Sequence, residues 1–153
     1  MQNLLFINPK QEAEKIVNFL KKTFKEQKIN KVILGLSGGI DSTVALYLLK
    51  KALPSKNIFA VQMDYKPREK LKIDLKGINV VKISIKKIVD QFEGSATSQV
   101  AKNLSRSPLA NNIRVGNIMA RVRMIVLFDL AKQLGALVCG TENKSEKLLG
   151  YFT

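Results

Sequence analysis

The sequence predicts an α/β fold, in which a doubly wound parallel sheet of about four strands is flanked by helices. Short apolar runs alternate along the chain with longer segments of helical periodicity, a pattern typical of βαβ units. The apolar runs do not alternate with polar residues, which indicates strands buried on both faces of a sheet. With 153 residues, 46% of them hydrophobic, the chain is long enough for one domain with a core. Since there is no internal repeat or linker, we expect residues 1–153 to form a single domain.

Four apolar runs are the predicted strands, and helical patterns fill most of the intervals between them. The strands are expected over residues 31–36, 57–63, 79–85 and 136–139. Helices are expected over residues 9–27, 41–53, 68–76, 86–92 and 115–133, with a helix start in 143–150. Asn8 and Pro9 are a suitable N-cap and first residue for the first helix. The polar stretch 94–112 is expected to be a loop with one helical turn near residues 100–104.

The predicted helix over residues 115–133 is apolar on more than one face. Ile118, Val122 and Ile125 lie on one side, and Met119, Val126 and Leu127 lie on another. A helix of this kind is buried on more than one side, either inside its own domain or against a second subunit. The sequence leaves open which face points outward.

The first strand leads into a glycine-rich turn and then directly into a helix. The turn comprises Gly35, Leu36, Ser37, Gly38, Gly39, Ile40, Asp41 and Ser42. Adjacent glycines let backbone N–H groups approach a ligand, and the start of the next helix adds unpaired N–H groups, so the turn suits an anion such as phosphate. Asp41 would repel phosphate unless a divalent cation lies between them. The alternative is an ordinary strand–turn–helix with a capping serine or aspartate.

Composition narrows the possible functions further. The chain carries 26 basic and 12 acidic residues, a net charge of +14, but the basic residues are dispersed, so nucleic acid is the less favoured partner. Histidine is absent, which excludes histidine-based catalysis, and the single cysteine, Cys139, excludes an intramolecular disulfide. No apolar run is long enough to span a membrane and the N-terminus lacks signal-peptide features, so we expect a cytoplasmic protein.

Three segments carry a resemblance to a known family. Residues 35–42 resemble the pyrophosphate-binding loop of the N-type ATP pyrophosphatases, and the Gly-Lys-Ser/Thr ending of a Walker A loop is absent. Residues 116–124 and 140–153 are similar to two further segments of the ammonia-dependent NAD synthetases, in the same order along the chain. The resemblance implies an adenine nucleotide alpha hydrolase-like, Rossmann-like fold and a cytoplasmic homodimer formed through residues 115–133.

The resemblance also implies roles for individual residues. Residues 35–42 would hold the phosphates of ATP, with Ser37 and Asp41 closest to the chemistry, and Thr141 would contact ATP. Asp41 and Glu146 would hold Mg²⁺, although Glu146 is also placed to cap a helix that starts at Asn143. Asn117 and Arg121 would contact deamido-NAD⁺. Met63, at the end of the second strand, is either a shelf for adenine or a core methionine.

The implied reaction is the amidation of deamido-NAD⁺ to NAD⁺. ATP would adenylate the nicotinate carboxylate, pyrophosphate would leave, and ammonia would displace AMP. Two alternatives stay open: another adenylating enzyme of this superfamily that acts on tRNA, and an inactive nucleotide-binding fragment. Chains of the family continue beyond the position of Thr153, so we expect a domain truncated at its C-terminal end, which binds ATP but forms no NAD⁺.

Overall fold

The computed structural model describes residues 7–67, 72–95, 99–100, 108–142 and 148. Its sheet has four parallel strands: β1 (Val32–Gly35), β2 (Ile58–Asp64), β3 (Asn79–Ser84) and β4 (Leu137–Cys139). Their spatial order is β3-β2-β1-β4. The predicted parallel α/β sheet of four strands is therefore confirmed.

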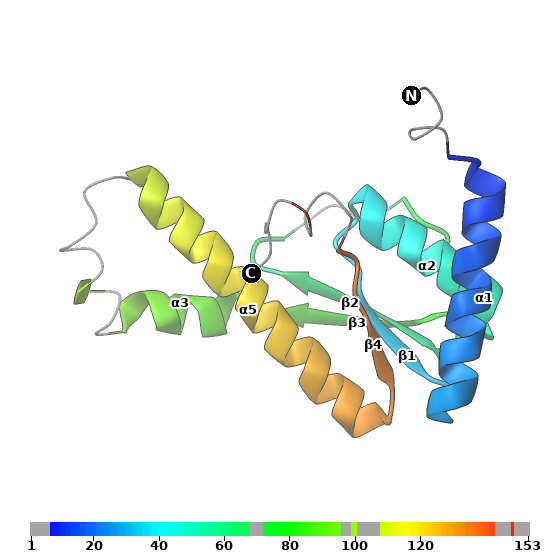
Figure 1. The fold of residues 1–153 in the computed structure, drawn as a ribbon. Coiled ribbons are helices and arrows are strands. Elements are labelled where there is room, and N and C mark those ends of the chain that lie inside the picture. Colours follow the sequence, from blue (N-terminus) through cyan, green and yellow to red (C-terminus); the bar gives the residue numbers. More distant parts are fainter. Residues whose placement is uncertain (1–6, 68–71, 96–98, 101–107, 143–147, 149–153) are drawn as a thin grey trace.

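Helices cover both faces of this sheet (Figure 1). Helices α1 (Pro9–Gln27) and α2 (Ile40–Ala52) lie on one face, and α3 (Lys86–Gly94) and α5 (Pro108–Leu134) lie on the other. A single 3₁₀ turn, η1 (Ser55–Asn57), precedes β2. Because the crossovers pass over opposite faces, the sheet is doubly wound, as the sequence predicted.

The central strand β1 supplies side chains to both layers of the core. Val32 and Leu34 pack with α1 and α2, whereas Ile33 packs with α3 and α5, and all three are at most 1% exposed. Successive side chains of a strand point to opposite faces, so a strand covered on both sides must be apolar at every position. This is the reason that the run from Val32 to Leu34 lacks polar residues.

The predicted boundaries of α1 are confirmed. The Asn8 side chain accepts hydrogen bonds from the backbone N–H groups of Lys10, at 3.1 Å, and Gln11, at 3.3 Å. These bonds satisfy two of the N–H groups that a helix start leaves without a partner. Pro9, the first residue of the helix, has no N–H to satisfy.

Two predictions about the helices are wrong. Residues 72–76, the described part of the predicted helix 68–76, form turns and irregular chain instead; the Asp74 side chain accepts from the backbone of Lys76 and from Lys50. Helix α5 begins at Pro108, seven residues before the predicted start at 115. Its first turns carry little apolar periodicity, and contacts of Arg114 with Asn111 and with Glu93 of α3 support them instead.

Other predicted elements are confirmed or lie outside the described residues. Helix α3 extends the predicted 86–92 segment by two residues. Residues 99–100 are helical, whereas 101–107, the rest of the predicted turn, lie outside the described part of the chain. Of the predicted helix start in 143–150, the structure describes only Leu148, which is helical.

Candidate phosphate site at the carboxyl edge of the sheet

The fold places the glycine-rich turn at the point where the strand order reverses. Strand β1 lies between β2 and β4, and the chain leaves β1 for one side of the sheet and later enters β4 on the other. The loops that follow β1 and β4 therefore begin side by side at the carboxyl edge. In open parallel sheets, ligands bind in the crevice at such a switch point.

The turn itself has the geometry of an anion site. Gly38 has a φ of +83°, which a residue with a side chain rarely adopts, and Gly39 is the N-cap of α2 without a side-chain hydrogen bond to the helix. The expected side-chain cap by serine or aspartate is therefore absent from this helix start, whereas the choice between a phosphate site and an ordinary turn stays a prediction. Asp41 is exposed in the first turn of α2, beside the positive end of the helix dipole.

The hydroxyl groups of the turn bond to one another and to its backbone. Ser37 Oγ accepts from the Gly39 N–H at 3.2 Å and lies 3.1 Å from Ser42 Oγ. Ser42 Oγ and Thr43 Oγ1 both lie within hydrogen-bond distance of the Gly39 carbonyl, at 3.1 and 2.8 Å. Ser42 is 3% exposed, whereas Ser37 is exposed at the surface. A bound anion would meet Ser37 before Ser42.

Gly35 has a different reason to be glycine. A Cβ atom at Gly35 would lie 3.1 Å from Leu127 Cδ1 of α5 and 3.5 Å from Met63 Cε of β2. Helix α5 therefore approaches β1 closely because Gly35 has no side chain. Leu36 is buried between the sheet and α1–α2, so only its backbone faces the turn.

Met63 is a member of the core between the sheet and α5. Met63 is 7% exposed, so of the two roles that the sequence allowed, the core methionine is the one observed. Contact with adenine stays a prediction. Its carbonyl, at the carboxyl edge, accepts a hydrogen bond at 3.3 Å from Arg123 Nε of α5. Arg123, which belongs to the segment 116–124 that carries the family resemblance, thus has a structural role as a link between α5 and β2.

The residues with predicted roles in metal and ATP binding are partly brought together. Asp41 and Thr141 line the same groove, although they are 100 residues apart in the sequence. An exposed carboxylate beside hydroxyl groups and a candidate phosphate site is the kind of position that suits Mg²⁺, which takes oxygen ligands from protein and phosphate together. Glu146 lies outside the described residues, and among the residues described no group of three or more potential metal ligands occurs.

Asn117 and Arg121 lie one turn apart on α5, the former half-buried and the latter exposed. At 100° per residue they share a face with Met124, Ile125 and Phe128. These three apolar side chains are 47%, 61% and 60% exposed. Leu127, in contrast, packs inward against the sheet. The structure thus settles which face of the helix points outward.

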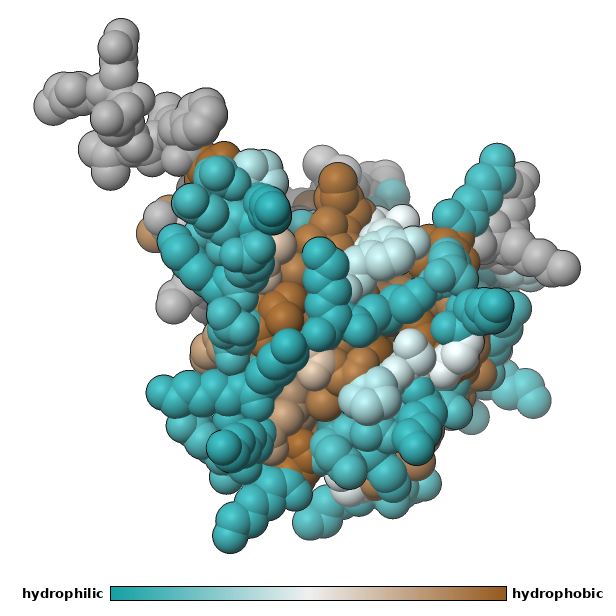
Figure 2. Space-filling model, turned by 90° about the vertical axis from the view of Figure 1, so that its right-hand side faces the viewer, coloured by the Kyte–Doolittle hydropathy of each residue, from teal (hydrophilic) through white to brown (hydrophobic). Residues whose placement is uncertain are grey.

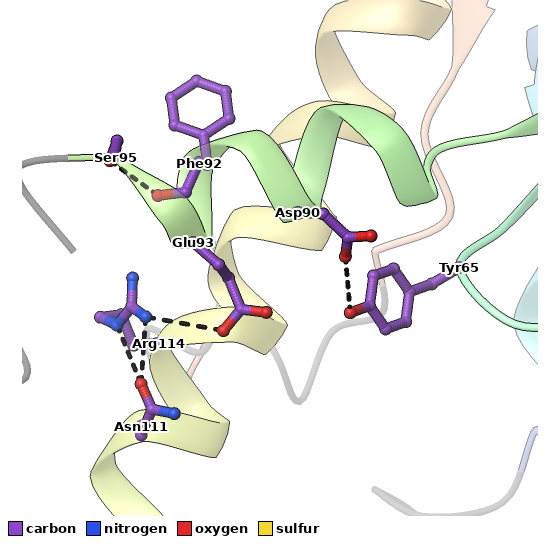
Figure 3. Close-up of polar contacts among 7 residues, drawn as sticks. All are labelled: Tyr65, Asp90, Phe92, Glu93, Ser95, Asn111 and Arg114. Atoms are coloured by element: carbon purple, nitrogen blue, oxygen red, sulfur yellow. Dashed lines mark hydrogen bonds and ion pairs between the residues drawn. The ribbon is translucent and has the colours of Figure 1, made fainter. Parts of the chain in front are cut away.

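A second polar cluster, which the sequence did not reveal, fixes α3 beside the end of β2 (Figure 3). Tyr65 Oη donates to Asp90 Oδ1 at 3.0 Å, Lys86 forms an ion pair with Asp90, and the Lys86 ammonium lies 5.5 Å from the centre of the Tyr65 ring. The Lys86 hydrogen bond lowers the pKa of Asp90, and the Asp90 hydrogen bond raises the pKa of both Tyr65 and Lys86.

Nearby, Arg114 of α5 lies between Glu93 of α3 and Asn111 (Figure 3). The spacing of Lys86 and Asp90 was the one sequence signal for this region, because residues four apart on a helix are neighbours. Tyr65 and Asp90 are 25 residues apart, and no local sequence pattern predicts their contact. Together the two groups of contacts tie α3 both to the segment after β2 and to α5.

The fold and site together define an α/β domain of the doubly wound type with a glycine-rich turn, the candidate phosphate loop, at its switch point. The sequence profile described as NAD synthase matches residues 12–153, and the chain belongs to this family. The expected family resemblance is therefore confirmed.

No helix among the described residues combines the length and apolar character needed to cross a membrane.

Curated relatives carry the same designation. The NH₃-dependent NAD⁺ synthetase of Fusobacterium nucleatum is 38% identical and aligns with 99% of this chain and 57% of its own length. The enzyme of the same name from Pyrococcus furiosus is 43% identical, with coverages of 92% and 52%. The chain thus spans little more than half the length of these relatives.

Solved structures with a similar fold include two synthetases. The NH₃-dependent NAD synthetase from Campylobacter jejuni, in complex with nitrate, superimposes with a TM-score of 0.78 at 34% identity, covering 97% of this chain and 62% of that one. The NMN synthetase from Francisella tularensis gives 0.74 at 31% identity, covering 97% and 60%.

Proposed function

We propose that this chain supplies the ATP-binding part of an ammonia-dependent NAD⁺ synthetase, a ligase that converts deamido-NAD⁺ to NAD⁺ with release of AMP and pyrophosphate. The observation that carries the proposal is the turn at Gly38, which opens onto the uncapped start of α2 at the switch point of an NAD synthase family domain. Backbone N–H groups there would hold the phosphates of ATP.

The residues of the turn would act on the phosphates that leave. Cleavage between the α- and β-phosphates places growing negative charge on pyrophosphate, and fixed N–H dipoles stabilise such charge without reorganisation. The exposed Ser37 hydroxyl adds a donor at the mouth of the turn. Thr141 would contact ATP from the opposite loop, since it shares a groove with Asp41.

Asp41, together with Glu146, would hold Mg²⁺ against the phosphates. The ion supplies charge neutralisation and orientation of the phosphate chain when bound. Asp41 is suited to this role because its residue is exposed and lies in the first turn of α2, next to the glycine-rich turn. Without a cation, this carboxylate would oppose phosphate binding.

Asn117 and Arg121 would bind deamido-NAD⁺, which carries phosphate and carboxylate groups that a guanidinium recognises well. They share the outer face of α5 with three exposed apolar side chains, Met124, Ile125 and Phe128. An exposed apolar surface of this kind on a helix commonly marks a subunit contact. We propose that two copies of the chain associate through this face, so that the homodimer places Arg121 at or beside the interface.

The match to the NAD synthase family favours this reaction over the alternative of a tRNA-modifying enzyme. Within the family, the named activity of the Francisella tularensis relative points to a second acceptor to be assayed, the mononucleotide that would yield NMN. The alternative of an inactive nucleotide-binding fragment is tested by measuring ATP binding and product formation, as described next.

Calorimetric titration of the 153-residue chain with Mg-ATP tests the proposal. We expect saturable binding that is lost when Gly38 is replaced by valine, because a side chain disfavours the positive φ at this position. Incubation with ammonium, Mg-ATP and either acceptor, followed by assay of NAD⁺ and NMN, measures the reaction itself. Absence of any ATP binding by the folded chain would contradict the proposed role of the turn.

A further inference from the structure

Lysines that are dispersed along the sequence are gathered by the fold at one edge of the sheet. Helices α1, α2 and α5 each lead into a strand, so all three end at the amino edge, where the strands begin (Figure 1). Each of these helices carries lysine in its last turn, and further lysines lie in the segments 28–31, 53–57 and 74–78 that lead into strands. We call the eight together the lysine edge: Lys25, Lys28, Lys31, Lys50, Lys51, Lys56, Lys76 and Lys132.

Contacts between these segments show that the lysine edge is one surface. The backbone N–H of Leu137, at the start of β4, donates to the Lys31 carbonyl at 3.0 Å. Lys31 Nζ in turn donates to the carbonyl of Leu134, the last residue of α5, at 3.2 Å. Lys50 Nζ of α2 lies 2.9 Å from an Asp74 carboxylate oxygen in the segment before β3. Figure 2 faces the end of the molecule on the right of Figure 1, and long hydrophilic side chains project from much of it.

Little acidic charge balances the lysine edge. Among the described residues of these last turns and segments, the acids are Glu26 and Asp74, and both already face a lysine. Glu26 lies 3.8 Å from Lys22, and Asp74 forms the ion pair with Lys50. At the carboxyl edge, in contrast, three acids offset the lysines of the described loops: Asp41, Asp64 and Glu142. The positive charge of the described chain is therefore concentrated on the side of the sheet away from the phosphate turn.

Helix dipoles explain only part of this arrangement. A lysine in the last turn of a helix is favoured by the dipole, which accounts for Lys25, Lys51 and Lys132. Lys28 is different, because it is the C-cap of α1 with a φ of +54°, a conformation that glycine or asparagine adopts more readily. Lys76 is exposed outside any helix. Gathered like charges repel one another, and a bound polyanion would relieve that repulsion.

The side chains of the lysine edge favour a phosphate backbone over other polyanions. Protein interfaces depend on aromatic or apolar anchors, and proteins that lie on membranes insert an apolar face. None of the large hydrophobic side chains that are exposed in the described chain lies in the last turns and segments of this edge. Lysine, moreover, binds phosphate as a point charge and reads no base.

The absence of stacking surface favours a duplex over a single strand. Single strands gain much of their affinity from bases stacked on aromatic side chains. The aromatic residue one turn before the end of α2 is Tyr47, and its ring is already faced by the Lys50 ammonium, 5.6 Å from the ring centre. A duplex needs no such stacking, because its phosphates are exposed along both strands.

We propose that the lysine edge binds double-stranded nucleic acid through its phosphate backbone, without sequence preference. The lysines at the ends of α1, α2 and α5 would replace the counterions condensed on the duplex, and release of those ions would drive binding. The sequence made nucleic acid the less favoured partner because its basic residues are dispersed, and the fold removes that objection. RNA and DNA duplexes share the phosphate chemistry. The lysine edge and the phosphate turn lie at opposite edges of the sheet, so this inference is independent of the proposed ATP chemistry.

The test is fluorescence anisotropy of labelled RNA and DNA duplexes of about 20 base pairs, titrated with the 153-residue chain at about 50 to about 200 mM salt. We expect a dissociation constant in the micromolar range at the lowest salt, and a slope of log affinity against log salt of about −4, equivalent to four or five phosphate contacts. A preference for one duplex identifies the nucleic acid that is bound, and equal affinities indicate recognition of phosphates alone.

The decisive variant removes one lysine from the end of each helix: Lys25→Gln, Lys51→Gln and Lys132→Gln together. Each lost phosphate contact reduces the salt slope by about 1, so the triple variant should bind at least about tenfold more weakly, with a slope smaller by about 2–3. The matched control also loses three exposed lysines, at the other end of the fold: Lys10→Gln, Lys66→Gln and Lys87→Gln. It has the same net charge and should bind almost as tightly as the unaltered chain.

Circular dichroism checks that both triple variants are folded, and the single variants Lys51→Gln and Lys132→Gln replace the first triple if it is not. The proposal is overturned if neither duplex binds, or if the two triple variants lose affinity equally, because the general charge of the chain would then explain binding. It is also overturned if poly-L-glutamate or phosphatidylserine vesicles bind as tightly as the duplexes, or if Mg-ATP displaces them, because binding would then involve the phosphate turn. Failure of ATP to bind would contradict the proposed function and leave the lysine edge unaffected.

Discussion

Replacing Gly35 with alanine tests the close approach of α5 to the sheet. The added Cβ would lie 3.1 Å from Leu127 Cδ1, so the leucine must move by a few tenths of an ångström, and 3.5 Å from Met63 Cε, an ordinary contact. The Gly35 backbone requires no positive φ, so strain comes from packing alone.

The expected cost follows from two opposing effects. Overpacking a well-packed core costs about 1–3 kcal/mol, whereas replacing glycine inside a strand gains about 0.5–1 kcal/mol of backbone entropy. We expect Gly35→Ala to lower the free energy of unfolding by up to about 2.5 kcal/mol, the largest difference between these ranges. The measurement is urea denaturation followed by circular dichroism, with comparison of midpoints at unchanged slope.

A double-mutant cycle with Leu127→Ala isolates the contact. Leu127→Ala alone should cost about 2 kcal/mol or more, because it leaves a cavity against the sheet. In the double variant the new methyl group occupies part of that cavity, so the combined loss should be smaller than the sum of the two by about 1 kcal/mol. Strict additivity, or an increase in stability for Gly35→Ala alone, would refute the reasoning that the glycine exists to admit Leu127.

Three further changes test the site and the surfaces. Asp41→Asn should weaken Mg-ATP binding more than metal-free ATP binding in calorimetric titrations, since a neutral amide no longer attracts the cation; equal losses would remove Asp41 from the metal. Phe128→Glu should convert the proposed homodimer to monomers in sedimentation velocity, with Phe19→Glu as the control that stays dimeric, and a monomeric wild type at high concentration would exclude the dimer. Asp90→Asn should flatten the loss of thermal stability as the pH falls from about 5 to about 3. The pKa of Asp90 is lowered chiefly by its bond to Lys86, so this stabilisation is present above the ordinary aspartate pKa and disappears as the carboxylate protonates. An unchanged acid profile would show that the ion pair contributes nothing to folding.

The sequence by itself determined those features that depend on neighbouring residues. The unbroken apolar run at Val32 predicted a strand covered on both faces, because only such a strand is apolar at every position. Asn8 predicted the start of α1, since a cap acts on the next three residues. The glycine-rich turn before Asp41 predicted a strand, a turn and a helix start in direct succession, and phosphate binding there stays a prediction.

Tertiary structure decided the features that depend on contacts between distant residues. The start of α5 could not be predicted, because contacts of Arg114 with Glu93 support it where apolar periodicity is weak. The contact of Tyr65 with Asp90 leaves no local pattern, as the partners lie on different elements. Leu127 and Phe128 are adjacent and equally apolar, yet one packs inward and the other is exposed. Which of them faces the core depends on where the sheet lies, and only the packed fold provides that direction.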